Sequence, residues 1–142
     1  MKHSGLIMLH RFPVTVYYED TDMGAIVYHA NYMKFVDRAR ADWVRAMGID
    51  QNALREQGYV FVVHRIEADF LASAKLDDQL EVQTRVESAT RSRLVLDQSI
   101  HRGHTALFRA RATLALVGLD GRPRRLPESL QALGKLGALM VM

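Results

Sequence analysis

Apolar and polar residues alternate in a short segment near the start of the chain. Phe12, Val14 and Val16 are apolar, and each is followed by a more polar or turn-forming residue. A period of two is typical of a β-strand with one buried face. We therefore expect a strand over residues 12–16 that ends at an acidic cluster, Glu19 to Asp22.

A longer segment with helical spacing follows the acidic cluster. Asn31 is a suitable N-cap and Gly48 a suitable end, so the sequence predicts a helix over 31–47. Its apolar side chains fall within about 120° of one another at 100° per residue, which predicts one buried face. These positions are Tyr32, Phe35, Val36, Ala39, Trp43, Ala46 and Met47.

The rest of the chain favours β-structure after a short helical turn at 50–57. One strand begins near Tyr59, and its predicted apolar face comprises Val62, His64, Ile66, Ala68 and Phe70. Three more strands are expected at about 79–90, 92–102 and 105–118. One strand, a long helix and four further strands predict an α+β fold in which an antiparallel sheet packs on one helix. Because one helix leaves an apolar sheet surface uncovered, we expect self-association.

The length and composition suit one compact domain. The chain has 142 residues, of which 49% are hydrophobic and 25% charged. We expect a single domain over 1–142, with its core at about 12–118 and a C-terminal tail at about 119–142. The absence of cysteine excludes disulfides, thiolate metal sites and cysteine nucleophiles, and favours a cytoplasmic location. The N-terminal segment has too few consecutive apolar residues for a signal peptide or membrane span.

The charge pattern does not favour a polyanionic partner. The net charge is +3, with 19 basic residues spread against 16 acidic ones, so nucleic-acid binding is not expected. A small ligand that carries phosphate groups would use the same charges. His101 and His104 form the only close histidine pair, and no third ligand accompanies them. We predict neither a metal site nor a cofactor.

The acidic cluster is the strongest candidate for chemistry. Glu19, Asp20 and Asp22 lie directly ahead of a helix, where free backbone amides favour negative charge. A solvated turn with a helix-capping acid would explain the acids alone. However, Gly24 and His29 stand within ten residues of them, so a base and a donor for an oxyanion are both available.

Several segments resemble one enzyme family in sequence and in order. The acidic cluster lies in Val16-Tyr-Tyr-Glu-Asp-Thr-Asp22, followed by Tyr28-His-Ala-Asn-Tyr32 and Phe35-Val-Asp-Arg-Ala-Arg40. Later matches are Asp69-Phe-Leu-Ala-Ser-Ala-Lys-Leu-Asp-Asp78 and Arg122-Pro-Arg-Arg-Leu-Pro127. The chain resembles the hotdog-fold thioesterases of the 4-hydroxybenzoyl-CoA thioesterase group, and most closely their Tol-Pal-associated branch.

This resemblance implies a five-stranded sheet wrapped around a central helix, and hydrolysis of an acyl-CoA or carrier-protein thioester. It implies that Asp22 is the catalytic carboxylate, either as nucleophile or as base on water. It also implies that the His29 backbone amide polarises the carbonyl, and that Tyr18 and the His29 side chain assist. The relatives place their sites between subunits, so a dimer or dimer of dimers is expected. A non-catalytic module that binds acyl chains or acyl-CoA is the alternative.

Other residues carry weaker expectations. Arg91, Arg93, Arg124 and Arg125 are candidate ligands for the CoA phosphates, because guanidinium groups suit phosphate oxygens. Ala25 stands where the branch usually has glycine, so the loop is expected to turn at Gly24 instead.

Overall fold

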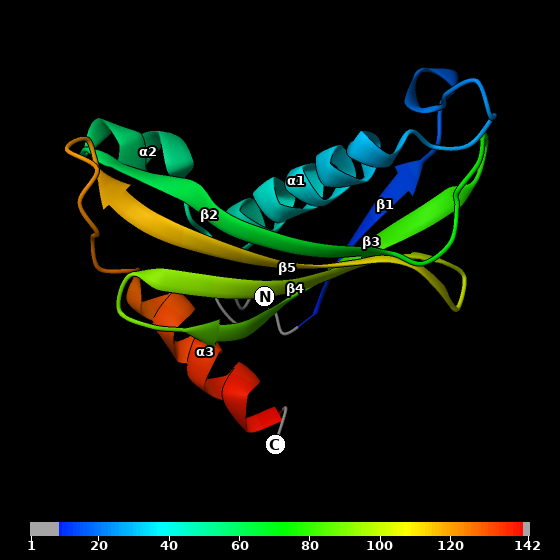
Figure 1. Ribbon diagram of the computed structural model, residues 1–142. Helices are drawn as coiled ribbons and strands as arrows, with labels where there is room; N and C mark the ends of the chain where they lie inside the picture. The colour runs from blue at the N-terminus through cyan, green and yellow to red at the C-terminus, as the bar shows by residue number, and fades with distance from the viewer. Residues whose placement is uncertain (1–8, 141–142) are drawn as a thin grey trace.

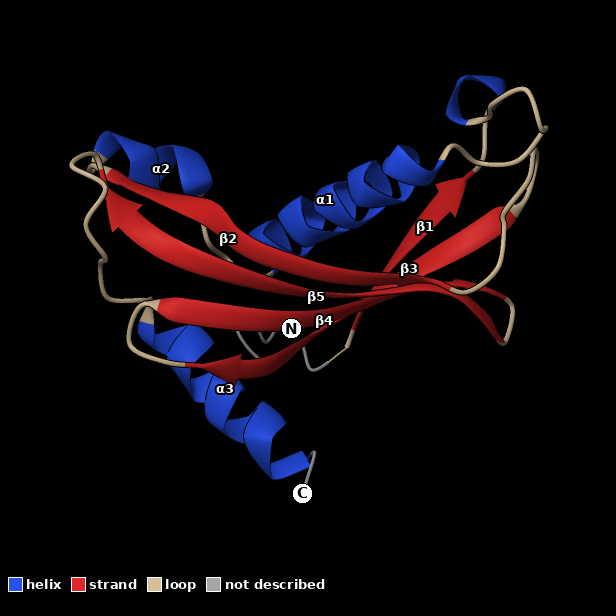
Figure 2. Ribbon diagram, in the orientation of Figure 1, coloured by secondary structure: helices blue, strands red, loops and turns tan. Residues whose placement is uncertain are grey.

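The computed structural model describes residues 9–140, in which a long helix lies across a curved antiparallel sheet (Figure 1). Figure 2 shows α1 on one side of the sheet, with α2 and α3 near opposite margins. The α+β hotdog prediction is confirmed. The elements are β1 (His10–Thr15), a 3-10 turn (Tyr18–Asp20), α1 (His29–Ala46), α2 (Gln51–Glu56), β2 (Tyr59–Phe70), β3 (Gln79–Ala89), β4 (Arg93–Arg102), β5 (Thr105–Gly118) and α3 (Glu128–Met140).

The sheet has the strand order β1-β3-β4-β5-β2, and all neighbouring strands are antiparallel. The three middle strands are consecutive in sequence and connected by short turns, as alternation in 79–118 predicts. Strands β1 and β2, which flank α1 in the sequence, form the two edges. The edge strand β2 pairs with β5 along its length, from Tyr59 opposite Gly118 to Phe70 opposite Phe108.

The core between α1 and the sheet consists of two hydrophobic clusters. The first surrounds the N-terminal half of α1 and includes Phe35 and Phe108. The second surrounds the C-terminal half, where Trp43 packs with Leu130 and Leu133 of α3. Helix α3 approaches β3 so closely that a side chain at Gly134 would collide with Ala89. The C-terminal segment therefore completes the second cluster.

A buried polar group occupies the middle of this helix–sheet interface. The Arg40 guanidinium donates to Gln98 Oε1 at 2.9 Å and to Asp37 at 3.2 Å. The Gln98 amide donates in turn to the Val36 carbonyl and to Thr84 Oγ1. Burial lowers the pKa of Arg40, and the neighbouring Asp37 opposes this effect. Because each side chain has a partner, a charged group is tolerated where helical spacing alone predicts only apolar contacts.

The start of α1 differs from the prediction. The helix begins at His29 rather than 31, with Tyr28 as N-cap, and ends at Ala46. Asn31 is not the cap: it is buried in the first turn, and its side-chain amide donates to the Asp20 carbonyl at 2.9 Å. Ala46, expected on the buried face, is exposed.

One face of β2 also differs from the prediction. The pairing of β2 with β5 shifts between Val63 and Arg65, which marks a bulge at His64. The bulge changes the phase of the strand, so Phe61 rather than Val62 packs on the second cluster, and Val62 and His64 are exposed. The prediction of a continuous apolar face from 62 to 70 was therefore wrong.

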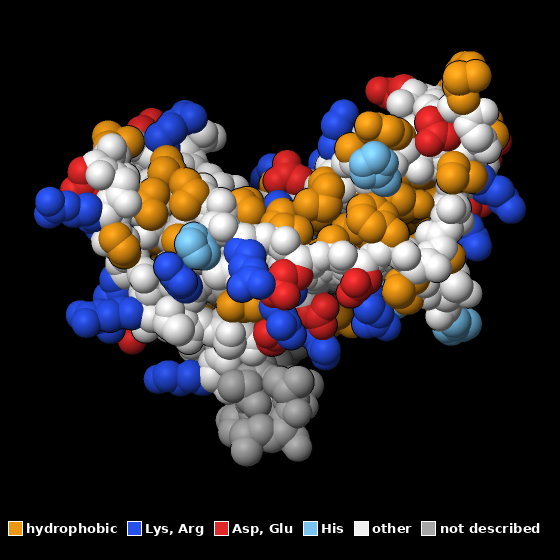
Figure 3. All heavy atoms as spheres, in the orientation of Figure 1, with side chains coloured by type: hydrophobic (Ala, Val, Ile, Leu, Met, Phe, Trp, Pro, Cys, Tyr) orange, Lys and Arg blue, Asp and Glu red, His pale blue; other side chains and the backbone are white. Residues whose placement is uncertain are grey.

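The sheet surface opposite α1 is charged, not apolar. Charged side chains from the strands lie interspersed across it, below the apolar band along β2 in Figure 3. The expectation that self-association would result from an uncovered apolar sheet face is therefore wrong for this surface. No helix within residues 9–140 is long and apolar enough to cross a membrane. The N-terminal segment considered above lies outside the described residues, apart from its last few.

Candidate active site

The acidic cluster forms a tight loop between β1 and α1. Thr21 and Val27 form an antiparallel bridge, and the Tyr28 amide donates to the Asp20 carbonyl at 2.9 Å. The Asp22 amide donates to the Ile26 carbonyl, which closes the tip of the loop. These bonds fix the segment that follows β1 beside the segment that leads into α1. They therefore bring the acids and the helix N-terminus into one small region.

Asp20 and Asp22 occupy different environments in this loop. Asp20 is buried, and its carboxylate accepts a hydrogen bond from the Tyr17 amide at 2.9 Å. Asp22 is exposed, and its Oδ1 accepts from the Gly24 amide at 2.8 Å. Asp20 thus holds the loop together, whereas the Asp22 carboxylate is oriented by one bond and remains accessible to a ligand.

The turn beyond Asp22 uses Ala25, not Gly24, for its left-handed residue. Ala25 has a φ of 62°, whereas the φ of Gly24 is not positive. The expectation that Gly24 would replace the missing glycine was therefore wrong. An L-residue in this region costs about 1–2 kcal/mol, which the loop's hydrogen bonds must offset.

A second loop supports the acidic one. The Val27 amide donates to the Ala74 carbonyl, and Ile26 bridges to Lys75. Asp78 anchors this second loop by accepting from the Lys75 amide at 2.9 Å and from Arg102 at 2.8 Å. Burial alone would raise the pKa of Asp78, but these two donors outweigh it and hold that pKa below its ordinary value. Sequence reasoning missed this anchor, because only the fold brings β4 to the 75–78 segment.

The N-terminus of α1 opens beside the loop. Within residues 9–140, neither His29 nor Ala30 donates its backbone amide to a protein acceptor. Such amides, together with the helix dipole, favour an anion or a developing negative charge. The His29 amide is therefore a free donor at the position that the sequence indicates.

The His29 ring faces an aromatic cluster. Its centroid lies 4.6 Å from the Tyr28 ring and 6.1 Å from the Phe70 ring at the end of β2. Phe70 also contacts Tyr32 and Phe108, yet it is 53% exposed. The clustering of hydrophobic side chains along this edge is visible in Figure 3. The site therefore has an apolar wall, which sequence reasoning missed because Phe70 was read only as a core residue.

Tyr18 forms no side-chain hydrogen bond to the Asp22 carboxylate within residues 9–140. It begins the 3-10 turn, and its side chain is 84% exposed. Its backbone carbonyl accepts from the Thr21 hydroxyl at 2.7 Å, and no bond of its own hydroxyl occurs within the described residues. Its expected assisting role gains no support from these contacts.

The four candidate phosphate ligands lie at the other end of the sheet. Arg91 and Arg93 flank the start of β4, and Arg124 and Arg125 follow β5. About 25–30 Å of strand separates this end from Phe70 and His29, given a rise of about 3.3 Å per residue. Arg124 is also engaged, because its guanidinium contacts Asp120 at 3.2 Å. These arginines do not line the same chain's Asp22 loop.

His101 and His104 were considered above as the close histidine pair of the sequence. Within the described part of the chain, no three potential metal-binding side chains converge. His101 instead bonds to Ser99 Oγ at 2.8 Å. Burial, reinforced by Arg109, lowers the pKa of His101, which favours its neutral form.

Comparison with known proteins shows the family of the chain. The thioesterase superfamily model matches residues 24–108. The acyl-CoA thioester hydrolase YbgC of Escherichia coli O157:H7 is 40% identical over 126 residues, which cover 87% of this chain and 94% of that protein. The acyl-CoA thioesterase YbgC of Haemophilus influenzae is 39% identical over 85% of this chain and 90% of its own length.

Solved structures agree on the fold. A probable thioesterase from Bartonella henselae superposes with a TM-score of 0.80 at 35% identity, covering 84% of this chain and 99% of that one. A DHNA-CoA thioesterase from Staphylococcus aureus gives a TM-score of 0.83 at 23% identity, covering 94% of each chain. At that lower identity, the likeness concerns the fold alone.

Proposed function

Since this chain belongs to the thioesterase superfamily, we propose that it hydrolyses acyl-CoA thioesters at the Asp22 loop. The observation that carries this proposal is the accessible Asp22 carboxylate on a loop bonded to the open N-terminus of α1. The similar YbgC proteins are named for this activity. The absence of cysteine remains the reason to expect a cytoplasmic enzyme.

The proposed chemistry divides the work between a carboxylate and a backbone amide. The His29 amide polarises the thioester oxygen, and the helix dipole stabilises the negative charge that develops there. Asp22 either attacks the carbonyl carbon or removes a proton from the attacking water. The Thr21–Val27 bridge and the bond from the Tyr28 amide to the Asp20 carbonyl hold the Asp22 segment beside the start of α1. The His29 side chain stands at the same helix start.

The exposed aromatic surface provides a place for the acyl group. Tyr28 and Phe70 flank His29, and Leu71 continues the apolar surface beyond β2. Burying such side chains against an acyl chain contributes about 25 cal/mol per Å² of apolar surface. This wall favours an acyl part with aliphatic or aromatic surface over a small polar one.

We further propose that two chains pair through the edge strand β2. This strand has 12 residues, is an edge of the sheet formed by the described strands, and has exposed Val62 and Val63 at its centre. A long, apolar edge of this kind is a template for another strand. Antiparallel pairing with a second copy would place Tyr59 near Phe70 of that copy. The arginines beyond Gly118 would then approach the second copy's site, where CoA phosphates could reach them.

Release of free CoA thiol from a panel of acyl-CoAs tests the activity. We expect Asp22→Asn to lower kcat at least 100-fold while the thermal unfolding midpoint stays within a few degrees, because asparagine keeps the oxygen that accepts from Gly24. Glu19→Gln, an exposed acid in the same segment, is the matched control and should retain activity. No thiol release by the wild type with any substrate would support the alternative of a binding module, and full activity of Asp22→Asn would exclude its proposed role.

The role of the amide can be separated from that of the ring at His29. Proline is well tolerated at the first position of a helix, and Tyr28, with φ −62° and ψ 130°, already has the conformation that precedes proline. His29→Pro removes the amide hydrogen and the ring, whereas His29→Ala removes the ring alone. We expect kcat of His29→Pro to be about 100-fold or more below that of His29→Ala. Equal activities would show that the amide is not the donor.

A further inference from the structure

The place of the Asp22 carboxylate is set by contacts of other residues. Asp22 is exposed, and within residues 9–140 its carboxylate accepts one hydrogen bond, from the Gly24 amide in the same turn. That bond orients the carboxylate within the loop, but it does not relate the loop to α1. The geometry between the carboxylate and the His29 amide must therefore depend on contacts between the loop and the helix.

Asn31 holds the first limb of the loop, residues 17–22. Its side-chain amide, in the first turn of α1, donates to the Asp20 carbonyl at 2.9 Å. The same carbonyl accepts from the Tyr28 amide, also at 2.9 Å. Because that backbone bond already satisfies the carbonyl, its burial does not require a second donor. The bond from Asn31 instead fixes Asp20, two residues before Asp22, against the helix.

Tyr32 holds the return limb of the loop, residues 26–28, through the second loop. Its hydroxyl oxygen accepts from the Ala74 amide at 2.9 Å, and the Ala74 carbonyl accepts from the Val27 amide at 2.8 Å. The Tyr32 ring stacks on Phe108 at a centroid distance of 5.3 Å, which fixes the hydroxyl relative to the sheet. Two adjacent residues of α1 thus hold both limbs.

Helix stability does not explain Asn31 at this position. Asparagine suits the N-cap, but it is less favourable than leucine inside a helix. Here the cap is Tyr28, and Asn31 is the third helical residue and buried. A buried polar side chain costs free energy unless it is hydrogen-bonded, and an apolar one of the same size would avoid that cost. What Asn31 adds over such a residue is its bond to Asp20.

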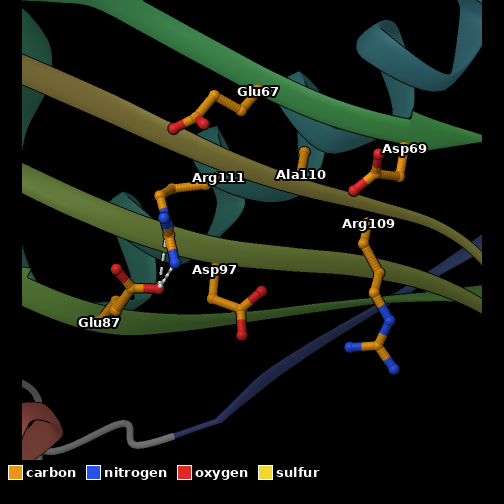
Figure 4. Close-up of a pocket in the computed structure, with 7 residues that line it drawn as sticks. All are labelled: Glu67, Asp69, Glu87, Asp97, Arg109, Ala110 and Arg111. Carbon is orange, nitrogen blue, oxygen red and sulfur yellow. Dashed lines mark hydrogen bonds and ion pairs between the residues drawn. The ribbon is translucent and has the colours of Figure 1, made fainter.

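Polar contacts on the sheet surface have a different character. Figure 4 shows Arg111 of β5 and Glu87 of β3, which join two strands at 3.0 Å on the face opposite α1. Both side chains are partly exposed, so solvent screens their attraction. Asn31 and Tyr32 are uncharged and buried, and their bonds hold a helix against two loops. Such bonds are shielded from water and fix one geometry.

We infer that Asn31 and Tyr32 are positioning residues that set the geometry between the Asp22 carboxylate and the His29 amide. This inference rests on the proposed function, in which these two groups act on the thioester. Displacing a reacting group by about 1 Å can lower the rate by about 100-fold. Loss of either bond should therefore lower kcat, and it should spare KM because the aromatic wall at Phe70 stays in place.

Thiol release by Asn31→Leu tests the first bond, because leucine keeps the size of asparagine and removes the donor. We expect kcat to fall roughly 10- to 100-fold while KM stays within about twofold of the wild-type value. Tyr32→Phe keeps the stacked ring and removes the acceptor. Its kcat should fall about fivefold, since its link to the loop runs through Ala74.

Thr84→Val is the matched control. It also removes a buried polar group, the hydroxyl that accepts from Gln98 at 2.9 Å. Thr84 lies opposite His10, at the end of β1 that is remote from the Asp22 loop. This variant should lower the thermal unfolding midpoint by a few degrees, as Asn31→Leu does, yet keep kcat within about twofold. Circular dichroism checks that every variant is folded.

Double variants separate positioning from stability. In Asp22→Asn or His29→Pro one of the two reacting groups is missing, so their relative geometry no longer matters. Adding Asn31→Leu to either background should therefore lower the residual kcat by less than about threefold. A purely structural role would lower kcat by the same factor in all three backgrounds. Tyr32→Phe is combined in the same way, and it decides alone if Asn31→Leu does not fold.

Two results would overturn the inference. One is a kcat within about twofold of the wild type for the folded single variants. The other is an equal loss of kcat in the wild-type, Asp22→Asn and His29→Pro backgrounds. Failure of the proposed function looks different: the wild type releases no thiol, or Asp22→Asn keeps full activity, and the positioning role then fails with it.

Discussion

The two ends of α1 are built for different purposes. At its C-terminal end, Trp43 is fully buried and α3 closes the core with Leu130 and Leu133. At its N-terminal end, the His29 amide has no acceptor among residues 9–140, and Tyr28 and Phe70 remain half-exposed. One helix thus joins a closed, packed end to an open end with unused donors and apolar surface.

The difference shows how stability and binding are separated in this fold. At the packed end, each buried leucine contributes free energy of unfolding through apolar area and close contacts. At the open end, a free amide and exposed rings contribute little to folding, but they can be satisfied by a ligand. Substitutions at the packed end should therefore change the free energy of unfolding strongly. Substitutions at the open end should change activity, or change the free energy of unfolding only slightly.

Leu130→Ala tests the packed end and carries the largest expected loss of stability. Leu130 is fully buried, so its truncation should lower the free energy of unfolding by about 2–5 kcal/mol through lost burial and the cavity left behind. Denaturant unfolding measures this change. Leu119→Ala, at a leucine that is 80% exposed, is the control and should change stability by less than about 0.5 kcal/mol. A small effect of Leu130→Ala would mean that α3 does not close the core.

Asp78→Asn tests whether the support of the open end depends on charge. The folded pKa of Asp78 is held below its ordinary value, so its contribution is present above the unfolded pKa and is lost as pH falls through the folded pKa. We expect the variant to lose about 1 kcal/mol at pH 7, a figure discounted because Arg102 is 38% exposed. The difference from wild type should shrink below about pH 4.

Denaturant unfolding from pH 3 to 7 measures this dependence. Asp77→Asn is the matched control, because Asp77 is an exposed neighbour with no ion pair among the described residues. A constant difference between Asp78→Asn and wild type across this range would assign the effect to packing instead of charge.

The sequence predicts the secondary elements well because hydrophobic periodicity reports burial directly. The helix, the four later strands and the family all follow from it and from the motifs. Its errors arise where contacts between distant segments decide. Asn31 has the propensity of a cap, but its amide bonds to Asp20, so the helix starts two residues earlier. No glycine marks the bulge at His64, so the phase change in β2 is invisible to periodicity.

The candidate site also combines residues that the sequence predicts with residues that only the fold brings together. The spacing from Asp22 to His29 identifies the loop, because both residues lie in one continuous segment. The apolar wall at Phe70 and the anchor at Asp78 come from segments 40 or more residues away in the sequence, and only the fold brings them to the Asp22 loop. The arginines beyond β5 show the opposite error. Their side chains suit phosphate oxygens, but they lie about 25–30 Å from the Asp22 loop of the same chain.

Ala25→Gly should produce the smallest change and should act on the open end alone. Ala25 holds a φ of 62°, which glycine adopts without the cost of a Cβ. Relief of that strain is partly offset by the greater freedom of glycine in the unfolded chain, so we expect a gain of about 0.5 kcal/mol and a rise in Tm of roughly 2 °C. Thermal unfolding measures the change. Ala41→Gly, within α1, should instead lower stability by about 1 kcal/mol. If Ala25→Gly destabilises the protein to the same extent, the loop beside Asp22 does not hold its left-handed residue in solution.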